Sequence, residues 1–141
     1  MWADALLAAE RAHAHRLLLW GLASFAVGLA VLVVARRRER SSLLFHFALQ
    51  TALWGAVTAA LGLHVPTQLR DVSGATRLDR LLWLNVGLDA GYTAVGATLA
   101  LAAWVLGRRL GGIGAGVAIA IQGLALLLLD ARFILVLERS L

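Results

Sequence analysis

The sequence predicts an all-α fold, a four-span antiparallel transmembrane helix bundle with short turns. Hydrophobic residues make up 61% of the 141 residues. Each of four apolar segments is long enough to cross a hydrocarbon core about 30 Å thick. These segments show neither the polar face of a soluble helix nor the alternation of a barrel strand. We therefore expect residues 1–141 to form one integral membrane domain, with spans at residues 17–35, 42–63, 81–107 and 113–137.

The first span follows a charged N-terminal stretch. That stretch contains two acids and lacks a basic region or a small-residue cleavage site, so we expect no signal peptide. Residues 2–15 are predicted to form an interfacial amphipathic helix or an early extension of the first span. The span is expected to end at the charged cluster 36–40, which contains four arginines.

The other spans are separated by turn-forming residues. Ser42 favours a helix start, and the second span is expected to end near His64. Residues 67–80 form the longest predicted loop, with a capping-type start to the third span at their end. Arginines 108–109 and the glycine-rich stretch 111–116 predict a tight turn into the fourth span.

All basic residues are arginine, and the formal net charge is +5. The arginines flank apolar spans, so membrane topology explains them better than nucleic-acid binding, and no nucleic-acid partner is expected. The Arg-only, Ala- and Leu-rich composition favours a bacterial inner (cytoplasmic) membrane. Clustering of arginines at the two short turns favours both termini outside.

Catalytic chemistry finds little support in the sequence. The absence of cysteine excludes disulfides, thiolate metal sites and cysteine nucleophiles. The glycines at 111–116 lack the Lys-Ser/Thr ending of a phosphate loop. His13 and His15 point in different directions along a helix, so no metal site is expected. We predict no enzymatic activity and no cofactor, although His15 and His64 share a depth at which they could hold haem or a pigment.

Small residues form stripes along three of the spans. Such stripes let membrane helices approach closely. The predicted helix-packing residues are Gly21, Ser24, Gly28, Gly55, Thr58, Gly62, Gly112, Gly116 and Gly123.

Two acids lie inside predicted spans. Asn85, Asp89 and Tyr92 share one helical face in the third span, and Asp130 lies in the fourth. Because these spans are antiparallel, both acids are expected near the same membrane side. Ionisable residues in lipid face the bundle interior and find partners, so this pair could carry a proton or hold a cation, with Gln122 nearby.

A structural role for the two acids is the alternative. In that case Asp130 pairs with Arg132 or Arg16, and Asp89 is satisfied by Asn85, Tyr92 or a backbone group. Contacts of this kind contribute on the order of 1 kcal/mol and set the register of the helices.

Three stretches carry a family resemblance. They are residues 45–54 with Phe45-His46, the string N-x-G-L-D-x-x-Y at 85–92, and residues 112–130. Together they resemble an uncharacterised family of small bacterial four-helix integral membrane proteins. The resemblance implies four spans and no particular activity. It also implies one shared polar core made of His46, Asn85, Asp89, Tyr92, Gln122 and Asp130.

Three functions stay open at this point. The first is a non-catalytic structural or accessory subunit, or a homo-oligomer, whose partners are the lipid bilayer and a larger membrane complex or further copies. The second is a carrier or channel for a proton, cation or small molecule that uses Asp89 and Asp130. The third is a haem- or pigment-binding module.

Overall fold

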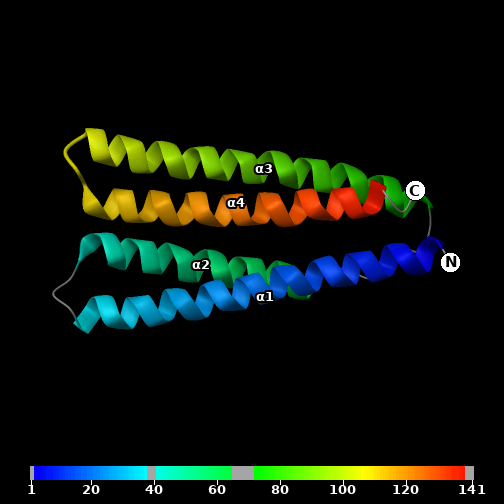
Figure 1. Cartoon of the computed structure of the whole chain (residues 1–141), viewed down its shortest axis with the longest axis horizontal. Helices are drawn as coiled ribbons and strands as arrows, with labels where there is room; N and C mark the ends of the chain where they lie inside the picture. Colours follow the sequence, from blue (N-terminus) through cyan, green and yellow to red (C-terminus); the bar gives the residue numbers. More distant parts are fainter. Residues whose placement is uncertain (1, 38–40, 65–71, 139–141) are drawn as a thin grey trace.

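The computed structural model describes residues 2–37, 41–64 and 72–138. They form four helices that lie side by side along the long axis of the molecule (Figure 1), with both chain termini at one end. We call that end the terminal end, and the opposite end, where α1 and α3 finish, the turn end. The helices are α1 (Trp2–Arg37), α2 (Ser42–His64), α3 (Val72–Val105) and α4 (Leu110–Glu138).

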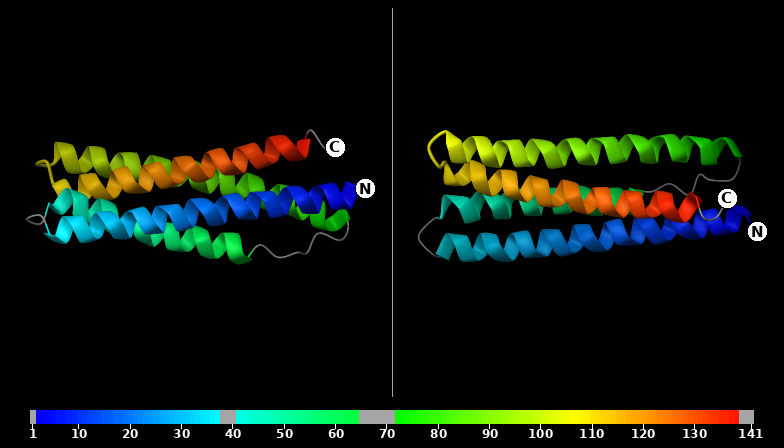
Figure 2. Two further views of the ribbon diagram at one scale, coloured as in Figure 1. Left: turned by 60° about the horizontal axis from the view of Figure 1, so that its bottom comes forward. Right: turned by 45° about the horizontal axis from the view of Figure 1, so that its top comes forward.

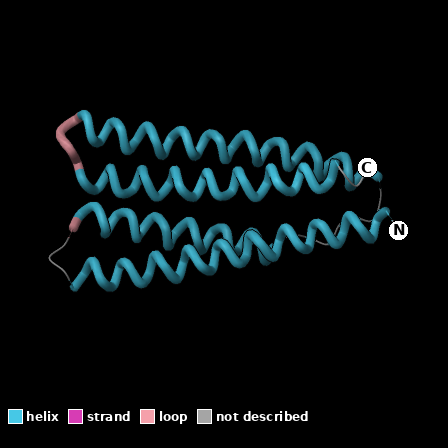
Figure 3. Tube along the Cα trace, viewed as in Figure 1, coloured by secondary structure: helices cyan, strands magenta, loops and turns pink. Residues whose placement is uncertain are grey.

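The all-α prediction is confirmed. All four helices are long and apolar enough to cross a membrane, which indicates a membrane protein. In Figure 3 helix accounts for nearly the whole described trace, apart from the short loop between α3 and α4 and the residue before α2. The apolar windows are Leu7–Arg36, Ser42–His64, Asp79–Val105 and Leu110–Glu138.

Two helices begin earlier than their apolar segments. Helix α1 is continuous from Trp2, so its N-terminal part is an extension of the first span and not a separate interfacial helix. Helix α3 begins at Val72, inside the loop predicted at residues 67–80. The early part of α1 is rich in Ala and also contains Leu, and both are good helix formers. The predicted turn residues 38–40 and the first loop residues lie outside the described residues.

Local chemistry sets the starts and ends. The Ser41 side chain accepts a hydrogen bond from the backbone N–H of Leu44 at 3.5 Å, as an N-cap does. At the end of α3, Gly107 has a φ of 110°, and Arg108 has a φ of 52°. The left-handed Gly107 reverses the chain, and Arg109 N then donates to the carbonyl of Ala103 at 2.8 Å.

Backbone-to-backbone packing joins α1 to α2 and α3 to α4. A Cβ added to Gly62 would lie 2.6 Å from Leu18 N, and one on Gly116 would lie 2.6 Å from the carbonyl oxygen of Gly96. Real Cβ atoms do not approach backbone so closely, so these positions require glycine. The backbone of the paired helix is equally close to four other predicted packing residues, Gly21, Gly28, Gly55 and Gly123. Gly112 faces the Ala103 side chain, and Ser24 and Thr58 are buried.

The α3–α4 seam follows a seven-residue spacing. On α3 the buried positions are Leu82, Asp89, Gly96 and Ala103, and on α4 they include Gly116, Gly123 and Asp130. A seven-residue repeat keeps one side of each helix facing its partner. Both aspartates therefore lie in the same interhelical seam.

The two helix pairs meet mainly through α2 and α4, and α1 touches α4 less extensively. Helix α3 lies on the outside of the bundle, packed on α4, in both views of Figure 2. It contacts α2 through an edge contact between Trp54 and Tyr92, whose ring centroids are 5.0 Å apart. The outward side of α3 therefore faces lipid or a partner.

Candidate functional site

Four ionisable side chains are buried together near the terminal end. Glu10 and His13 come from α1, Asp89 from α3 and Asp130 from α4, and each is only 5–6% exposed. We call these four residues the acid–histidine cluster. Burying ionisable groups without partners is costly, so their contacts decide what the cluster can do.

The centre of the cluster is a pair between His13 and Asp130. The imidazole Nε2 lies 3.1 Å from Asp130 Oδ1. The same imidazole stacks on the ring of Phe133, with centroids 4.4 Å apart and planes within 10°. Because the carboxylate oxygen accepts, Nε2 donates this hydrogen bond and Nδ1 keeps a free lone pair. The stacked Phe133, itself buried, holds the imidazole in the orientation that this bond needs.

Several buried polar atoms of the cluster lack a partner. Within the described ranges, Glu10 Oε2, His13 Nδ1 and Asp89 Oδ2 make no hydrogen bond. Asp89 and Asp130 lie close enough to interact electrostatically, as do Glu10 and His13. Buried atoms of this kind are normally satisfied, so these three are open acceptors for a proton or a water molecule.

The cluster lies within the apolar windows of α1, α3 and α4, towards the terminal end. Arg16 and Arg36 are about 30 Å apart along α1, and Leu110 and Asp130 are about 30 Å apart along α4, at 1.5 Å per residue. A hydrocarbon core about 30 Å thick that begins at the turn end would therefore finish near Asp130. The cluster would then lie where the hydrocarbon meets the lipid head groups on the terminal side.

Two further predicted residues, Gln122 and Tyr92, lie closer to the turn end than Asp130 does. Gln122 is buried, and its Oε1 accepts a hydrogen bond of 2.9 Å from Trp20 Nε1 of α1. Tyr92 is 38% exposed and packs against Trp54. Gln122 therefore ties α4 to α1 and is separated from Asp130 by about 12 Å along the helix.

The structure does not bring the six predicted polar residues together. His46 lies near the turn end, where its Nδ1 donates to the carbonyl of Ser42 at 2.8 Å. Asn85 is exposed. Of the six predicted residues, Asp89 and Asp130 lie close enough to interact electrostatically. His15 and His64, considered for haem, both have exposed side chains.

The partners of the two aspartates differ from those predicted. Asp130 pairs with His13 and not with Arg132 or Arg16. Asp89 Oδ2 receives no hydrogen bond from Asn85 or Tyr92 among the described residues, while the Asp89 backbone carbonyl accepts from the Thr93 hydroxyl at 2.8 Å. Asn85 is exposed although it lies one helical turn from the buried Asp89 on α3.

Sequence reasoning missed Glu10 and His13 as site residues. Their spacing predicts a buried face of α1, because small or buried residues recur at intervals of three and four along this helix. The residues on this face are Glu10, His13, Leu17, Gly21, Ser24 and Gly28. All six side chains or positions are buried. This periodicity is visible in the sequence only if residues 2–37 are taken as one continuous helix.

Comparison with known proteins identifies a family. Residues 16–131 match the model of a family of unknown function, DUF6992. The chain belongs to this family. The matched region contains Asp89 and Asp130 and begins after Glu10 and His13. No curated protein and no solved structure matches the chain.

Proposed function

We propose that this protein is a small membrane carrier that binds and releases protons at the acid–histidine cluster. The observation that carries the proposal is the buried His13–Asp130 pair at 3.1 Å, beside two further carboxyls that each have an oxygen without a partner. Ionisable residues inside membrane helices commonly mark proton or ion pathways.

The contacts favour a proton over a metal cation. Across residues 2–37, 41–64 and 72–138, no group of three or more His, Asp or Glu side chains is spaced to hold a metal ion. A proton needs one lone pair, whereas a metal ion needs several converging ligands. His13 can take a proton at Nδ1 while Nε2 continues to donate to Asp130.

The position of the cluster suits exchange with one aqueous face. Asp130 lies about 30 Å along α4 from Leu110, so a hydrocarbon core about 30 Å thick that begins at the turn end would finish near it. Arg36, Arg108 and Arg109 lie at the turn end, and arginines beside span ends favour the cytoplasmic side. In this proposal the protein lies in a bacterial inner membrane with both termini outside, and the cluster is the point at which protons cross between the outer face and the pathway through the bundle. It has no enzymatic activity of its own.

Proton flux into liposomes tests the proposal. Purified protein is reconstituted with an entrapped pH-sensitive dye, and a potassium diffusion potential drives protons inward. We expect His13→Gln and Asp130→Asn each to reduce flux to the rate of protein-free liposomes. His15→Gln and Asp79→Asn are matched controls, because both side chains are exposed on the same helices as His13 and Asp89, and both variants should retain flux.

A structural or accessory role, with or without self-association, is the second candidate. Gly87 and Gly91 lie one helical turn apart on α3, and a Cβ added to either would meet nothing within 4 Å. Small residues at this spacing are a common membrane-helix association motif. Both glycines are exposed, so a second copy or another membrane protein could pack on this face.

Replacement of both glycines by leucine separates the two candidates. If the protein associates through this face, Gly87→Leu/Gly91→Leu should reduce its mass in mild detergent to that of a monomer, as measured by light scattering. Proton flux should persist in that variant if each chain carries its own cluster. An unchanged mass would argue against association through Gly87 and Gly91.

A further inference from the structure

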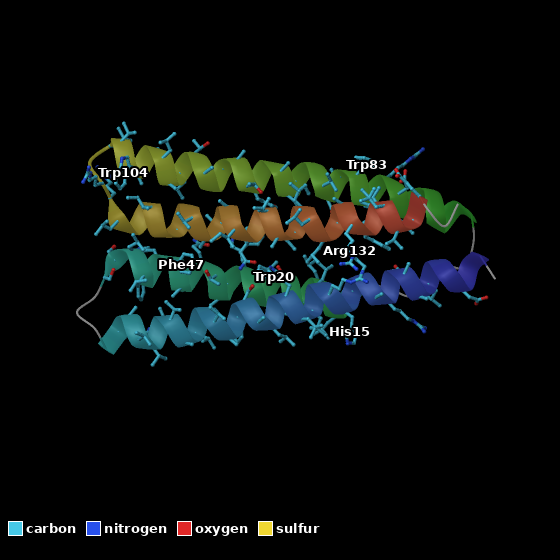
Figure 4. All side chains as sticks on the ribbon, in the orientation of Figure 1. His15, Trp20, Phe47, Trp83, Trp104 and Arg132 are labelled. Carbon is cyan, nitrogen blue, oxygen red and sulfur yellow. The ribbon has the colours of Figure 1, made fainter. Side chains whose placement is uncertain are left out.

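A surface groove runs between α1 and α4, separate from the acid–histidine cluster. It encloses about 540 Å³. In Figure 4, Trp20 and Arg132 lie in the space between the two helices, whereas His15 lies on the far side of α1. The groove is lined by Arg16, Leu19, Trp20, Ala125, Leu128, Leu129 and Arg132.

The lining divides into a charged end and an apolar floor. Arg16 precedes Trp20 by one helical turn on α1, and Arg132 follows Leu128 by one turn on the antiparallel α4. Both arginines therefore lie on the terminal side of the apolar residues. In the part of the chain that the structure describes, neither guanidinium is ion-paired with a carboxylate. Two positive charges thus flank one end of an apolar groove.

The apolar floor is fixed in shape. Trp20 donates its indole N–H to buried Gln122, which holds the ring as a wall between the helices. Ala125 contributes no bulk beside it, while Leu19 is 60% and Leu128 63% exposed. Exposed leucines on both rims are suited to an acyl chain, because lipid tails and leucine side chains are equally apolar.

We propose that this groove binds one anionic phospholipid. The lipid phosphate lies between Arg16 and Arg132, and an acyl chain extends over Ala125 and Leu128 towards the turn end. Guanidinium groups bind phosphate oxygens through paired hydrogen bonds. Arg16 lies about 30 Å along α1 from Arg36, which places the charged end where head groups begin. Basic pockets between membrane helices are known to recognise anionic head groups.

Native mass spectrometry tests the stoichiometry and the charge preference. The protein is delipidated in mild detergent and titrated with phosphatidylglycerol or, in parallel, with phosphatidylcholine of the same acyl chains. We expect one phosphatidylglycerol to remain bound to the wild type under conditions that release phosphatidylcholine. Arg16→Gln/Arg132→Gln should lose this preference. Arg36→Gln/Arg109→Gln removes the same charge from exposed positions at the turn end. This variant should retain the preference for phosphatidylglycerol.

Fluorescence quenching locates the bound lipid. In a variant whose other tryptophans are phenylalanine, brominated phosphatidylglycerol should quench Trp20 more strongly than brominated phosphatidylcholine. Ala125→Phe fills the groove without changing charge and should abolish that difference, which keeps the test decisive if the double arginine variant does not fold. Equal quenching by both lipids in the wild type would overturn the proposal. Displacement of phosphatidylglycerol by millimolar inorganic phosphate would also overturn it, because the site would then recognise phosphate alone.

Discussion

His13 Nε2 lies 3.1 Å from Asp130 Oδ1, and the imidazole stacks on Phe133, three residues further along α4. This contact joins two helices that otherwise pack mainly on other partners. Together with the bond from Trp20 to Gln122, it provides the polar link between α1 and α4. Removing either residue should therefore affect both the packing of α1 on α4 and the protonation chemistry of the cluster.

The first prediction concerns energetic coupling between His13 and Asp130. A hydrogen bond to a charged group contributes about 1.5–3 kcal/mol, so His13→Gln and Asp130→Asn should each lower the free energy of unfolding by about that amount. The double variant should lose less than the sum of the two, because both substitutions remove the same interaction. The four free energies of this double-mutant cycle are measured by unfolding in mixed detergent micelles, followed by circular dichroism. Additive losses would mean that the pair is not coupled.

The second prediction concerns close helix packing. Gly116→Ala places a Cβ 2.6 Å from the Gly96 carbonyl oxygen, and overpacking of this kind costs about 1–3 kcal/mol or more. Gly91→Ala is the matched control, because its Cβ meets nothing within 4 Å. Thermal unfolding should show a lower midpoint for Gly116→Ala and no loss for Gly91→Ala. Equal effects of the two substitutions would contradict the α3–α4 seam.

The third prediction concerns the bond between Trp20 and Gln122. Gln122→Leu leaves the indole N–H of Trp20 without its acceptor, which should cost about 1 kcal/mol. The indole N–H signal of Trp20 in an ¹⁵N-tryptophan NMR spectrum, assigned by its loss in Trp20→Phe, should then move. The signal of the exposed Trp83 should stay unchanged and serves as the internal reference. A stationary Trp20 signal would mean that the bond is absent in the membrane protein.

The fourth prediction concerns topology. The chain contains no cysteine, so single cysteines can be introduced directly. Ala8→Cys and Glu138→Cys, both at exposed positions near the terminal end, should react with a membrane-impermeant maleimide from outside the cell. Leu110→Cys, exposed at the turn end, should react only after the membrane is opened. Reaction of Ala8→Cys and Leu110→Cys from the same side would contradict a spanning bundle.

Hydropathy predicted the number of helices because a membrane-spanning helix must be apolar over its full length. The helical extension of the first span through residues 2–15 was one of two alternatives, and α1 has it. The start of α3 was not predicted, since Val72 begins a helix inside the segment 67–80 that was expected to be a loop. Helix propensity and packing continue these helices beyond the apolar zone. Hydropathy does not register that continuation.

The candidate site was only partly predictable for the same reason. Counting residues along antiparallel spans placed Asp89 and Asp130 at one depth, and the structure places both in one seam. Glu10 and His13 precede the first apolar segment, so hydropathy gave no reason to bring them to Asp130. The rotation of α3 about its own axis depends on its contact with α4, and this rotation leaves Asn85 exposed while Asp89 is buried.

The most direct test of the account compares proton flux in liposomes containing the wild type, Asp130→Asn or Asp79→Asn. We expect flux for the wild type and for Asp79→Asn, and the protein-free rate for Asp130→Asn, with all three equally helical by circular dichroism. His13→Gln gives the same test should Asp130→Asn not fold. Wild-type flux at the protein-free rate, or flux that survives in Asp130→Asn, would contradict the claim that the acid–histidine cluster carries protons.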